Sequence, residues 1–149
     1  MDEVLTRFNE NGVRYLLIGG QAARLEGMPR FSMDWDLYIP PHDTANLERI
    51  NRLLGDDLDA PLVPLGGRGE NFIQTYQTRW GVIQFHLGGP GLPPFDEADG
   101  RAVVHRTEGG VRVRCLCGFD LLESKRRANR PVDQDDIRFL EKKREAGLL

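Results

Sequence analysis

Apolar residues in the first quarter of the chain switch between helical and strand spacing. In segment 2–12 they recur on one helix face, and the segment ends in Asn-Gly, a common helix stop. The run "VRYLLIGG" at 13–20 predicts a short buried strand that ends in glycines. Segment 21–28 suits a helix, and "MDWDLYIPP" at 33–41 alternates and stops at two prolines, which indicates a second strand.

The remaining pattern predicts one amphipathic helix, several strands and a helical C-terminus. Segment 42–57 has the apolar spacing of an amphipathic helix. Segments 72–87 and 102–116 each predict two strands joined by a tight turn. Segments 118–129 and 131–147 predict two C-terminal helices. With no repeat or linker, residues 1–149 are expected to form a single mixed α/β (α+β) domain with flanking helices.

Composition narrows the class of protein. The formal net charge is −3, so we expect no non-specific binding of duplex DNA. No apolar stretch approaches the roughly 20 residues of a membrane span, and the acidic N-terminus lacks the features of a signal peptide. We therefore expect no membrane association and a cytoplasmic location. Cys115 and Cys117 are the only cysteines, too few for a disulfide framework or a four-ligand zinc site.

Two acidic residues in the second predicted strand point to metal chemistry. Strand alternation puts the carboxylates of Asp34 and Asp36 on one face, and Trp35 and Leu37 on the other. Two like charges this close repel each other, and a cation relieves the repulsion. Mg²⁺ is typically held by one or two carboxylates together with substrate phosphates. Asp34 and Asp36 are therefore candidate ligands for Mg²⁺ or Mn²⁺.

The glycines before the pair predict a place for the phosphates. Gly19 and Gly20 lie between a strand and a helix, where backbone N–H groups can approach an anion closely. Arg30 could add a bidentate phosphate contact. Each feature alone has a plainer explanation: a Gly-Gly strand end is common, an Asp-x-Asp pair can be incidental, and a lone arginine often forms a surface salt bridge. The order of all three favours a phosphate site.

These residues resemble the nucleotidyltransferase superfamily, which includes DNA polymerase beta and the antibiotic nucleotidylyltransferases. Its signature is an apolar strand, Gly-Gly or Gly-Ser, and then Asp-x-Asp in a second strand; here it reads "LLIGG", thirteen residues and "DWDLYI". The run "R-x-S-x-D-x-D" from Arg30 looks like the branch containing the small AbiEii-type toxin and antitoxin-associated proteins. The C-terminal segment is similar to that branch at Asp120, Leu121, Lys125, Arg130, Asp133, Asp136 and Ile137.

The resemblance implies a reaction and roles for several residues. The protein would transfer a nucleoside monophosphate from an NTP to a hydroxyl acceptor and release pyrophosphate. The implied roles are metal binding for Asp34 and Asp36, seating of the phosphates for Gly19 and Gly20, and steadying of phosphoryl charge for Arg30 and Lys125. The acceptor stays open between an antibiotic, a transfer RNA end and a side chain of a partner protein.

One position departs from the superfamily pattern. Relatives carry a third carboxylate on a later strand, and in "GVIQFHL" Gln84 takes its place. Glutamine cannot take a proton; His86, two residues on, could act as ligand or base, although core or edge histidines are more frequent. Glu70 in the preceding loop is a further candidate.

The alternative is a catalytically inactive protein that binds a nucleotide or a partner, for example in a toxin–antitoxin pair. The small size also favours a homo-oligomer.

Overall fold

The computed structural model describes every residue from Met1 to Leu149. No helix in it combines the length and the apolar character that crossing a membrane requires. Its elements, in chain order, are α1 (Asp2–Glu10), β1 (Leu16–Ile18), α2 (Gly19–Leu25), β2 (Trp35–Tyr38), α3 (Thr44–Leu54), η1 (Gly55–Asp57), β3 (Ile73–Thr78), β4 (Gly81–His86), α4 (Phe95–Gly100), β5 (Val103–Arg106), β6 (Arg112–Cys115), α5 (Gly118–Ala128), η2 (Pro131–Asp133) and α6 (Gln134–Glu145), where η marks a short 3-10 helix.

The six strands form one mixed sheet in the order β3-β4-β2-β1-β6-β5. β1 pairs antiparallel with β2 and parallel with β6, and β2 pairs parallel with β4. The outer pairs, β3–β4 and β5–β6, are antiparallel hairpins. The predicted mixed sheet with flanking helices is confirmed, and the strands predicted at 13–20 and 33–41 are direct neighbours.

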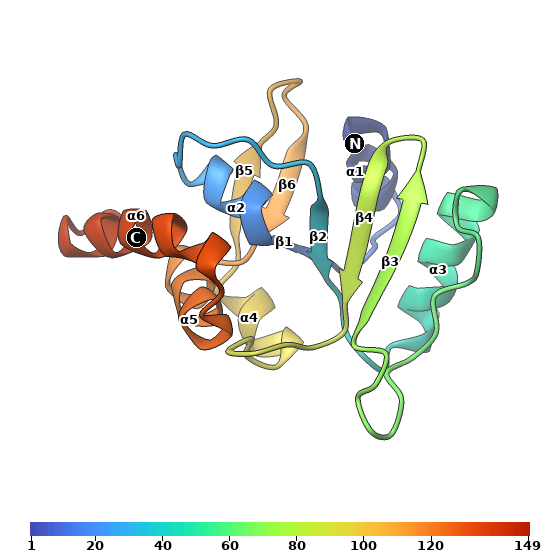
Figure 1. Ribbon diagram of the computed structural model, residues 1–149. Coiled ribbons are helices and arrows are strands. Elements are labelled where there is room, and N and C mark those ends of the chain that lie inside the picture. The colour runs from blue at the N-terminus through green and yellow to red at the C-terminus, as the bar shows by residue number, and fades with distance from the viewer.

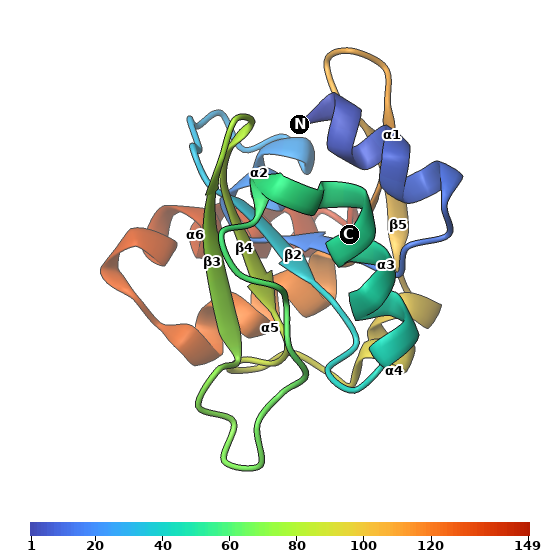
Figure 2. The same ribbon diagram turned by 90° about the vertical axis from the view of Figure 1, so that its right-hand side faces the viewer.

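Helices lie on both sides of the sheet. α3 lies on one side of β3 and β4, and α2, α5 and α6 lie on the other (Figure 1). The view from the right shows α1 and α3 in front of the sheet, with α5 and α6 behind it (Figure 2). This arrangement buries alternate residues of β4: Ile83 and Phe85 are fully buried, whereas Gln84 and His86 are partly exposed. One face of β4 therefore belongs to the core and the other carries polar groups.

β1 is shorter than the sequence predicts. Ordered pairing covers only Leu16–Ile18, because the backbone before it is bonded elsewhere. The N–H of Arg14 donates to Asn46 Oδ1 at 2.8 Å, and Asn46 Nδ2 donates back to the Arg14 carbonyl at 3.0 Å. Asn46 is completely buried on α3, so this side chain acts as a substitute strand partner. The interaction joins α3 to the start of β1 and orients the strand that leads to the glycines.

Candidate active site

Asp36 contacts a histidine from a neighbouring strand. The parallel ladder of β2 and β4 places Asp36 opposite Gln84 and Tyr38 opposite His86, so all four side chains lie on one face of the sheet. His86 Nε2 is 2.8 Å from Asp36 Oδ1. The Asp36 and His86 side chains are 16% and 15% exposed, respectively, so the pair is sheltered and still reaches solvent. The structure therefore brings Asp36, Gln84 and His86 together.

Gly19 lies directly against the carboxylate of Asp36. β1 pairs Ile18 with Asp36, and the chain then turns into α2 at Gly19 with a φ of +71°. A Cβ at Gly19 would come well inside 3.0 Å of Asp36 Oδ2. Only glycine combines this backbone conformation with this approach. The structure thus joins the predicted glycine turn to the predicted acidic strand.

Gly20 is packed by the segment that leads into β2. A Cβ at Gly20 would lie 2.7 Å from Ser32 Oγ and 3.3 Å from Arg30 Cζ. Gln21 Nε2 donates to the Ser32 carbonyl at 2.7 Å and holds this segment against α2. Gly19, Gly20 and Arg30 therefore share one neighbourhood, and Ser32 adds a hydroxyl that the sequence did not single out.

Asp34 lies one residue before β2 and is partly exposed. No group of three or more His, Cys, Asp or Glu side chains is gathered in a way that would hold a metal ion. The donors that are present nevertheless suit Mg²⁺, because this ion commonly takes one or two carboxylates and completes its shell with phosphates and water. Asp36 Oδ2, which lies beside Gly19, is the oxygen whose position fits such a role.

The carboxylate of Glu70 is held within its own loop. Its Oε2 accepts from the N–H of Arg68 at 3.0 Å, and its carboxylate packs against Gly66. These contacts stay within the loop that precedes β3, the green loop projecting below the sheet in Figure 1. The contacts of Glu70 thus leave Gln84 and His86 as the β4 residues beside Asp36.

Arg30 and Lys125 meet on a buried carboxylate, that of Asp136. Arg30 Nη1 contacts Asp136 Oδ2, and Lys125 Nζ lies 2.9 Å from the same oxygen. Lys125 Nζ also lies 3.5 Å from Asp133 Oδ1, and Arg130 Nε donates to Asp133 Oδ2 at 2.9 Å. Three cations thus alternate with two carboxylates, which leaves the chain of charges with an excess of one positive charge.

Burial and charge act in opposite directions on this network. Burial disfavours ionised Asp133, but hydrogen bonds from Arg130 and the charge of Lys125 outweigh it and lower its pKa. The bonds to Asp133 raise the pKa of Arg130, and the charges of Asp36 and Asp136 add to the effect. The Arg130 side chain is 63% exposed, so it is the member of the network that solvent reaches most easily. The charge of Asp36 also acts on it.

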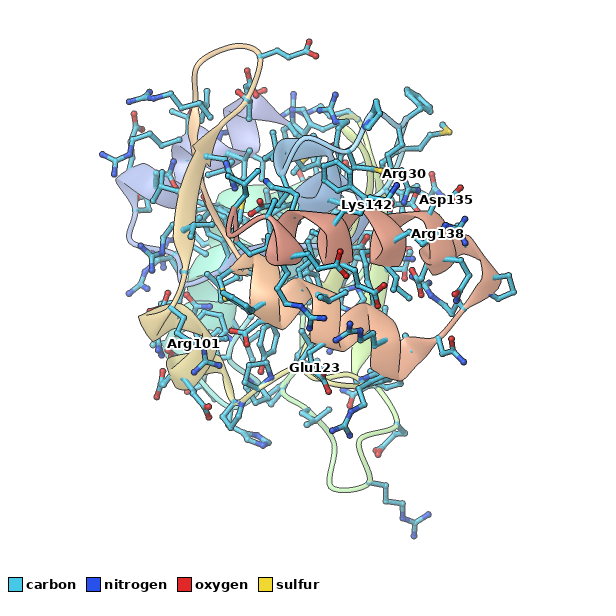
Figure 3. All side chains as sticks on the ribbon, turned by 90° about the vertical axis from the view of Figure 1, so that its left-hand side faces the viewer. Arg30, Arg101, Glu123, Asp135, Arg138 and Lys142 are labelled. Atoms are coloured by element: carbon cyan, nitrogen blue, oxygen red, sulfur yellow. The ribbon has the colours of Figure 1, made fainter.

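The other end of the network borders a small pocket. Arg30, Asp136, Met28 and Val132 help to line a cavity of about 280 Å³. Figure 3 shows Arg30 at the same end of α6 as Asp135 and Arg138. Asp136 Oδ1 is buried and has no hydrogen-bond partner. One carboxylate oxygen of Asp136 therefore contacts two cations, whereas the other has no hydrogen-bond donor.

Arg130, Asp133 and Asp136 are residues whose place at the site sequence reasoning missed. They appear in the C-terminal family-like motif, but their separation from Arg30 by about a hundred positions hides the contact. The sequence does contain one signal for this cluster. Two acidic residues three positions apart follow a lysine and an arginine in the segment predicted to form two helices. Only the packing of α5 and α6 against α2 shows that Asp136 contacts Arg30. Lys125 then links Asp136 to Asp133 and Arg130.

Comparison with known proteins gives structural matches but no sequence matches. No protein-family model matches the chain. No curated protein matches it either. The antibiotic-resistance factor ANT(2'')-Ia in solution matches with a TM-score of 0.56 at 16% identity, over 93% of this chain and 77% of that chain.

Two further solved structures have the same architecture. The lincosamide antibiotic adenylyltransferase LnuA, bound to lincomycin, matches with a TM-score of 0.55 at 16% identity, over 93% of this chain and 92% of that chain. TM1012 from Thermotoga maritima, provisionally named a nucleotidyltransferase, matches with a TM-score of 0.57 at 13% identity, over 96% and 87%. The chain therefore has the fold of the nucleotidyltransferases.

Proposed function

We propose that this protein transfers a nucleoside monophosphate from an NTP to a hydroxyl acceptor. The observation that carries the proposal is the meeting of the Gly19 turn with the Asp36–His86 pair. A phosphate-seating turn and a polar acid–base pair are the two parts that such a transfer needs. The structural neighbours LnuA and ANT(2'')-Ia, an adenylyltransferase and an antibiotic-resistance factor, support the same reaction class.

The phosphates would bind at the start of α2. Backbone N–H groups at Gly19 and Gly20 would face them, and Arg30 and Arg130 would supply the positive charge from two sides. Lys125 is 5% exposed and bonds to Asp133 and Asp136. It would therefore act on the nucleotide through the network, by holding the carboxylates that position Arg30 and Arg130. The surplus positive charge of the network would offset the negative charge of the phosphates.

His86 would accept the proton of the acceptor hydroxyl. With Asp36 ionised and His86 neutral, Nε2–H of His86 would donate to Asp36, because an ionised carboxylate only accepts hydrogen bonds, and Nδ1 would keep a lone pair. The hydroxyl oxygen forms a bond to the α-phosphorus, the bond to pyrophosphate breaks, and the hydroxyl proton moves to Nδ1. Gln84, directly opposite Asp36, can orient the acceptor through its amide but cannot take this proton.

Asp34 and Asp36 would hold Mg²⁺ or Mn²⁺, which neutralises charge on the phosphates when bound. Such catalysis depends mostly on positioning and electrostatics, so a site with two carboxylates would work slowly rather than fail.

We place the reaction in the cytoplasm. The motif at Arg30 and the segment from Asp120 to Ile137 support a relation to the AbiEii-type branch.

The alternative is a protein of this fold that binds a nucleotide or a partner without catalysis. Gln84 at the position opposite Asp36 is the observation in its favour, since the third acid of active relatives is absent there. Such a protein would work in a homo-oligomer or in a toxin–antitoxin pair. Under this alternative His86 and Asp36 would stay bonded to each other, and no acceptor would be modified.

The test separates binding from transfer. Purified protein is incubated with each labelled NTP in Mg²⁺ or Mn²⁺ and with aminoglycosides, a lincosamide, transfer RNA and cell protein as acceptors. Transfer of labelled NMP that is lost in Asp36→Asn supports the enzyme. A melting temperature that NTP and metal raise, without transfer to any acceptor, supports the binding protein.

The double change Asp34→Asn with Asp36→Asn completes the experiment. It should remove the metal-dependent part of the NTP-induced shift in melting temperature, because both carboxylates that suit the ion are gone. Glu97→Gln with Glu123→Gln is the charge-matched control, since it removes two solvent-accessible carboxylates that pair with Arg101 and Arg127 away from both pockets. A full metal-dependent shift in the Asp34→Asn, Asp36→Asn variant would mean that the pair is not the metal site.

A further inference from the structure

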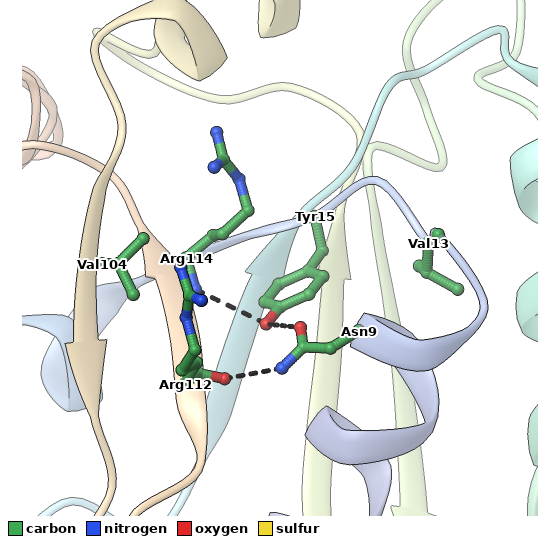
Figure 4. A pocket seen from close by; sticks show the side chains of 7 residues that line it. Asn9, Val13, Tyr15, Val104, Arg112 and Arg114 are labelled. Atoms are coloured by element: carbon green, nitrogen blue, oxygen red, sulfur yellow. Dashed lines mark hydrogen bonds between the residues drawn. The ribbon is translucent and has the colours of Figure 1, made fainter.

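A second pocket lies at the opposite end of β1 from the candidate active site. It has a volume of about 370 Å³ and is bordered by the end of α1, the segment before β1 and the β5–β6 hairpin (Figure 4). It opens beside Tyr15, before the start of β1, whereas Asp36 pairs with Ile18 at the end of that strand. Its lining residues are Asn9, Gly12, Val13, Tyr15, Val104, Arg112 and Arg114.

Three arginines occupy one face of the hairpin at this pocket. Arg112 and Arg114 are two residues apart on β6, so their side chains point to the same side. Arg106 on β5 is the direct cross-strand partner of Arg112. Like charges placed directly opposite each other on two strands destabilise the sheet. The fold therefore keeps an unfavourable contact at this position.

The protein does little to neutralise these charges. Of the 20 Lys and Arg side chains, 13 form an ion pair within 4.0 Å. Arg114 is among them through Asp99, whereas Arg106 and Arg112 are not. Arg49, also without a carboxylate partner, donates to the carbonyl of Gly12 at the pocket. Of the seven unpaired cations, Arg112 thus lines this cavity and Arg49 bonds to one of its lining residues. Arg106 lies across the ladder from Arg112, and its Nη1 donates to the Gly110 carbonyl at 2.9 Å.

The floor of the pocket is rigid and already satisfied. The Tyr15 hydroxyl donates to Asn9 Oδ1 at 2.8 Å and accepts from the N–H of Arg114 at 3.4 Å. Asn9 Nδ2 donates to the Arg112 carbonyl at 2.7 Å (Figure 4). Burial raises the pKa of Tyr15 to about 12, so this hydroxyl stays neutral and adds no negative charge. The unsatisfied groups at the pocket are therefore the guanidinium donors.

We propose that this pocket binds a phosphate group carried by a nucleotide, either free or within a single-stranded RNA. Guanidinium groups recognise phosphate oxygens through paired N–H donors, and here Arg112 and Arg106 have donors to spare. Val104, Val13 and the ring of Tyr15 give the pocket an apolar wall beside the charges, which suits a nucleoside next to its phosphate. The volume lies within the range of small-ligand sites. The site is separate from the active site and does not depend on the proposed reaction.

The experiment follows backbone amide signals by NMR during titration. The probes are AMP, adenosine and a 5'-phosphorylated single-stranded RNA of about eight nucleotides, and the reporters are Gly12 and Val104 for this pocket and Gly19 for the active site. AMP or RNA should shift Gly12 and Val104, whereas adenosine, which lacks the phosphate, should not. A response to AMP identifies the free nucleotide as ligand; a response to RNA alone identifies the strand.

A charge-matched pair of variants tests which arginines are responsible. Arg106→Gln with Arg112→Gln should weaken the response at Gly12 and Val104 by at least about tenfold. Arg68→Gln with Arg144→Gln removes the same charge from two unpaired arginines elsewhere and should change it by less than about twofold. Without ligand, the first variant should melt no lower than the wild type, because a like-charge contact is removed.

Two results would overturn the proposal. One is the absence of any shift at Gly12 and Val104 with AMP or RNA up to about 10 mM. The other is an equal loss of affinity in both double variants, which would reduce the effect to overall charge. Signals of Gly19 that respond while those of Gly12 do not would assign nucleotide binding to the active site only.

Discussion

His86 Nε2 lies 2.8 Å from Asp36 Oδ1, although the two residues are 50 positions apart in the chain. The contact is diagonal across the parallel strands β2 and β4, since the ladder sets Asp36 opposite Gln84 and Tyr38 opposite His86. It joins an aspartate that follows the glycine turn to a histidine from a later strand. Any change that moves Asp36 must therefore also change how His86 is held.

Gly19→Ala should destabilise the protein and disturb Asp36. The φ of +71° is strained for alanine, and the new Cβ would clash with Asp36 Oδ2. Together these effects should lower the free energy of unfolding by roughly 1–3 kcal/mol, as measured by chemical denaturation. Gly67→Ala is the control: no atom lies within 4 Å of its Cβ position and its φ is not positive, so a change within about 0.5 kcal/mol is expected. Equal losses in the two variants would contradict the close approach of Gly19 to Asp36.

Lys125→Met should destabilise the protein more strongly. It removes the cation shared by Asp133 and Asp136, which are both 1% exposed, and leaves two buried carboxylates short of a partner. Breaking a buried pair in this way costs roughly 3–5 kcal/mol of unfolding free energy. The matched change Arg127→Met breaks an exposed pair with Glu123 and should cost under about 1 kcal/mol. A loss for Lys125→Met as small as that for Arg127→Met would show that the network is not a buried structural unit.

Glu26→Gln should change how stability depends on pH. His105 and Lys143 contact the carboxylate of Glu26, and the hydrogen bond with His105 followed by that with Lys143 lowers its pKa below 4.5 against the effect of burial. Because the folded-state pKa is the lower one, the stabilisation is fully present above 4.5 and is lost as the pH falls through the folded-state value. Unfolding curves between about pH 6 and pH 3 should therefore converge for wild type and variant at the acidic end. Parallel curves would exclude this role of Glu26.

The local elements could be predicted because each one is determined by its own side-chain pattern. The alternating pattern in 33–41 and the two prolines that end it were enough to place one strand. The continuous apolar run in 13–20 was enough to place the strand that pairs with it. The length of β1 was not predictable in this way, since it depends on Asn46 of α3 bonding to the backbone of Arg14. That contact joins residues 32 positions apart, which no local pattern reports.

The candidate site shows the same division. The two-residue spacing of Gln84 and His86 predicts a shared strand face, and the ladder to β2 confirms it. The partners of Arg30 could not be inferred, because Asp136 reaches it only after α5 and α6 pack together behind α2. Glu70 looked available as an acid in the sequence, but its carboxylate is bonded within its own loop. The residue types indicated which side chains could belong to the site, whereas the contacts between residues far apart in the chain could be found only in the structure.

Gln84→Asp tests whether the position opposite Asp36 is a weakened third-acid site. A carboxylate there would face Asp36 across the ladder, so without metal the two negative charges should lower the melting temperature. Mg²⁺ with NTP should reverse that loss, and transfer of NMP should increase, since general-base help is worth on the order of 10²–10⁴ in rate. The measurements are thermal unfolding with and without Mg²⁺ and labelled-NMP transfer at several metal concentrations.

Gln77→Asp and His86→Ala provide the controls for this change. Gln77 lies on the same sheet face but pairs with Val82, so an acid there adds the same charge away from Asp36 and should not create metal-dependent stabilisation. His86→Ala removes the proposed base and the partner of Asp36 Oδ1. If His86→Ala abolishes transfer while Gln84→Asp leaves it unchanged, His86 alone fills the third position. If transfer is fast in the wild type and neither change alters it, β4 does not supply the base, because both of its polar residues beside Asp36 would then be dispensable.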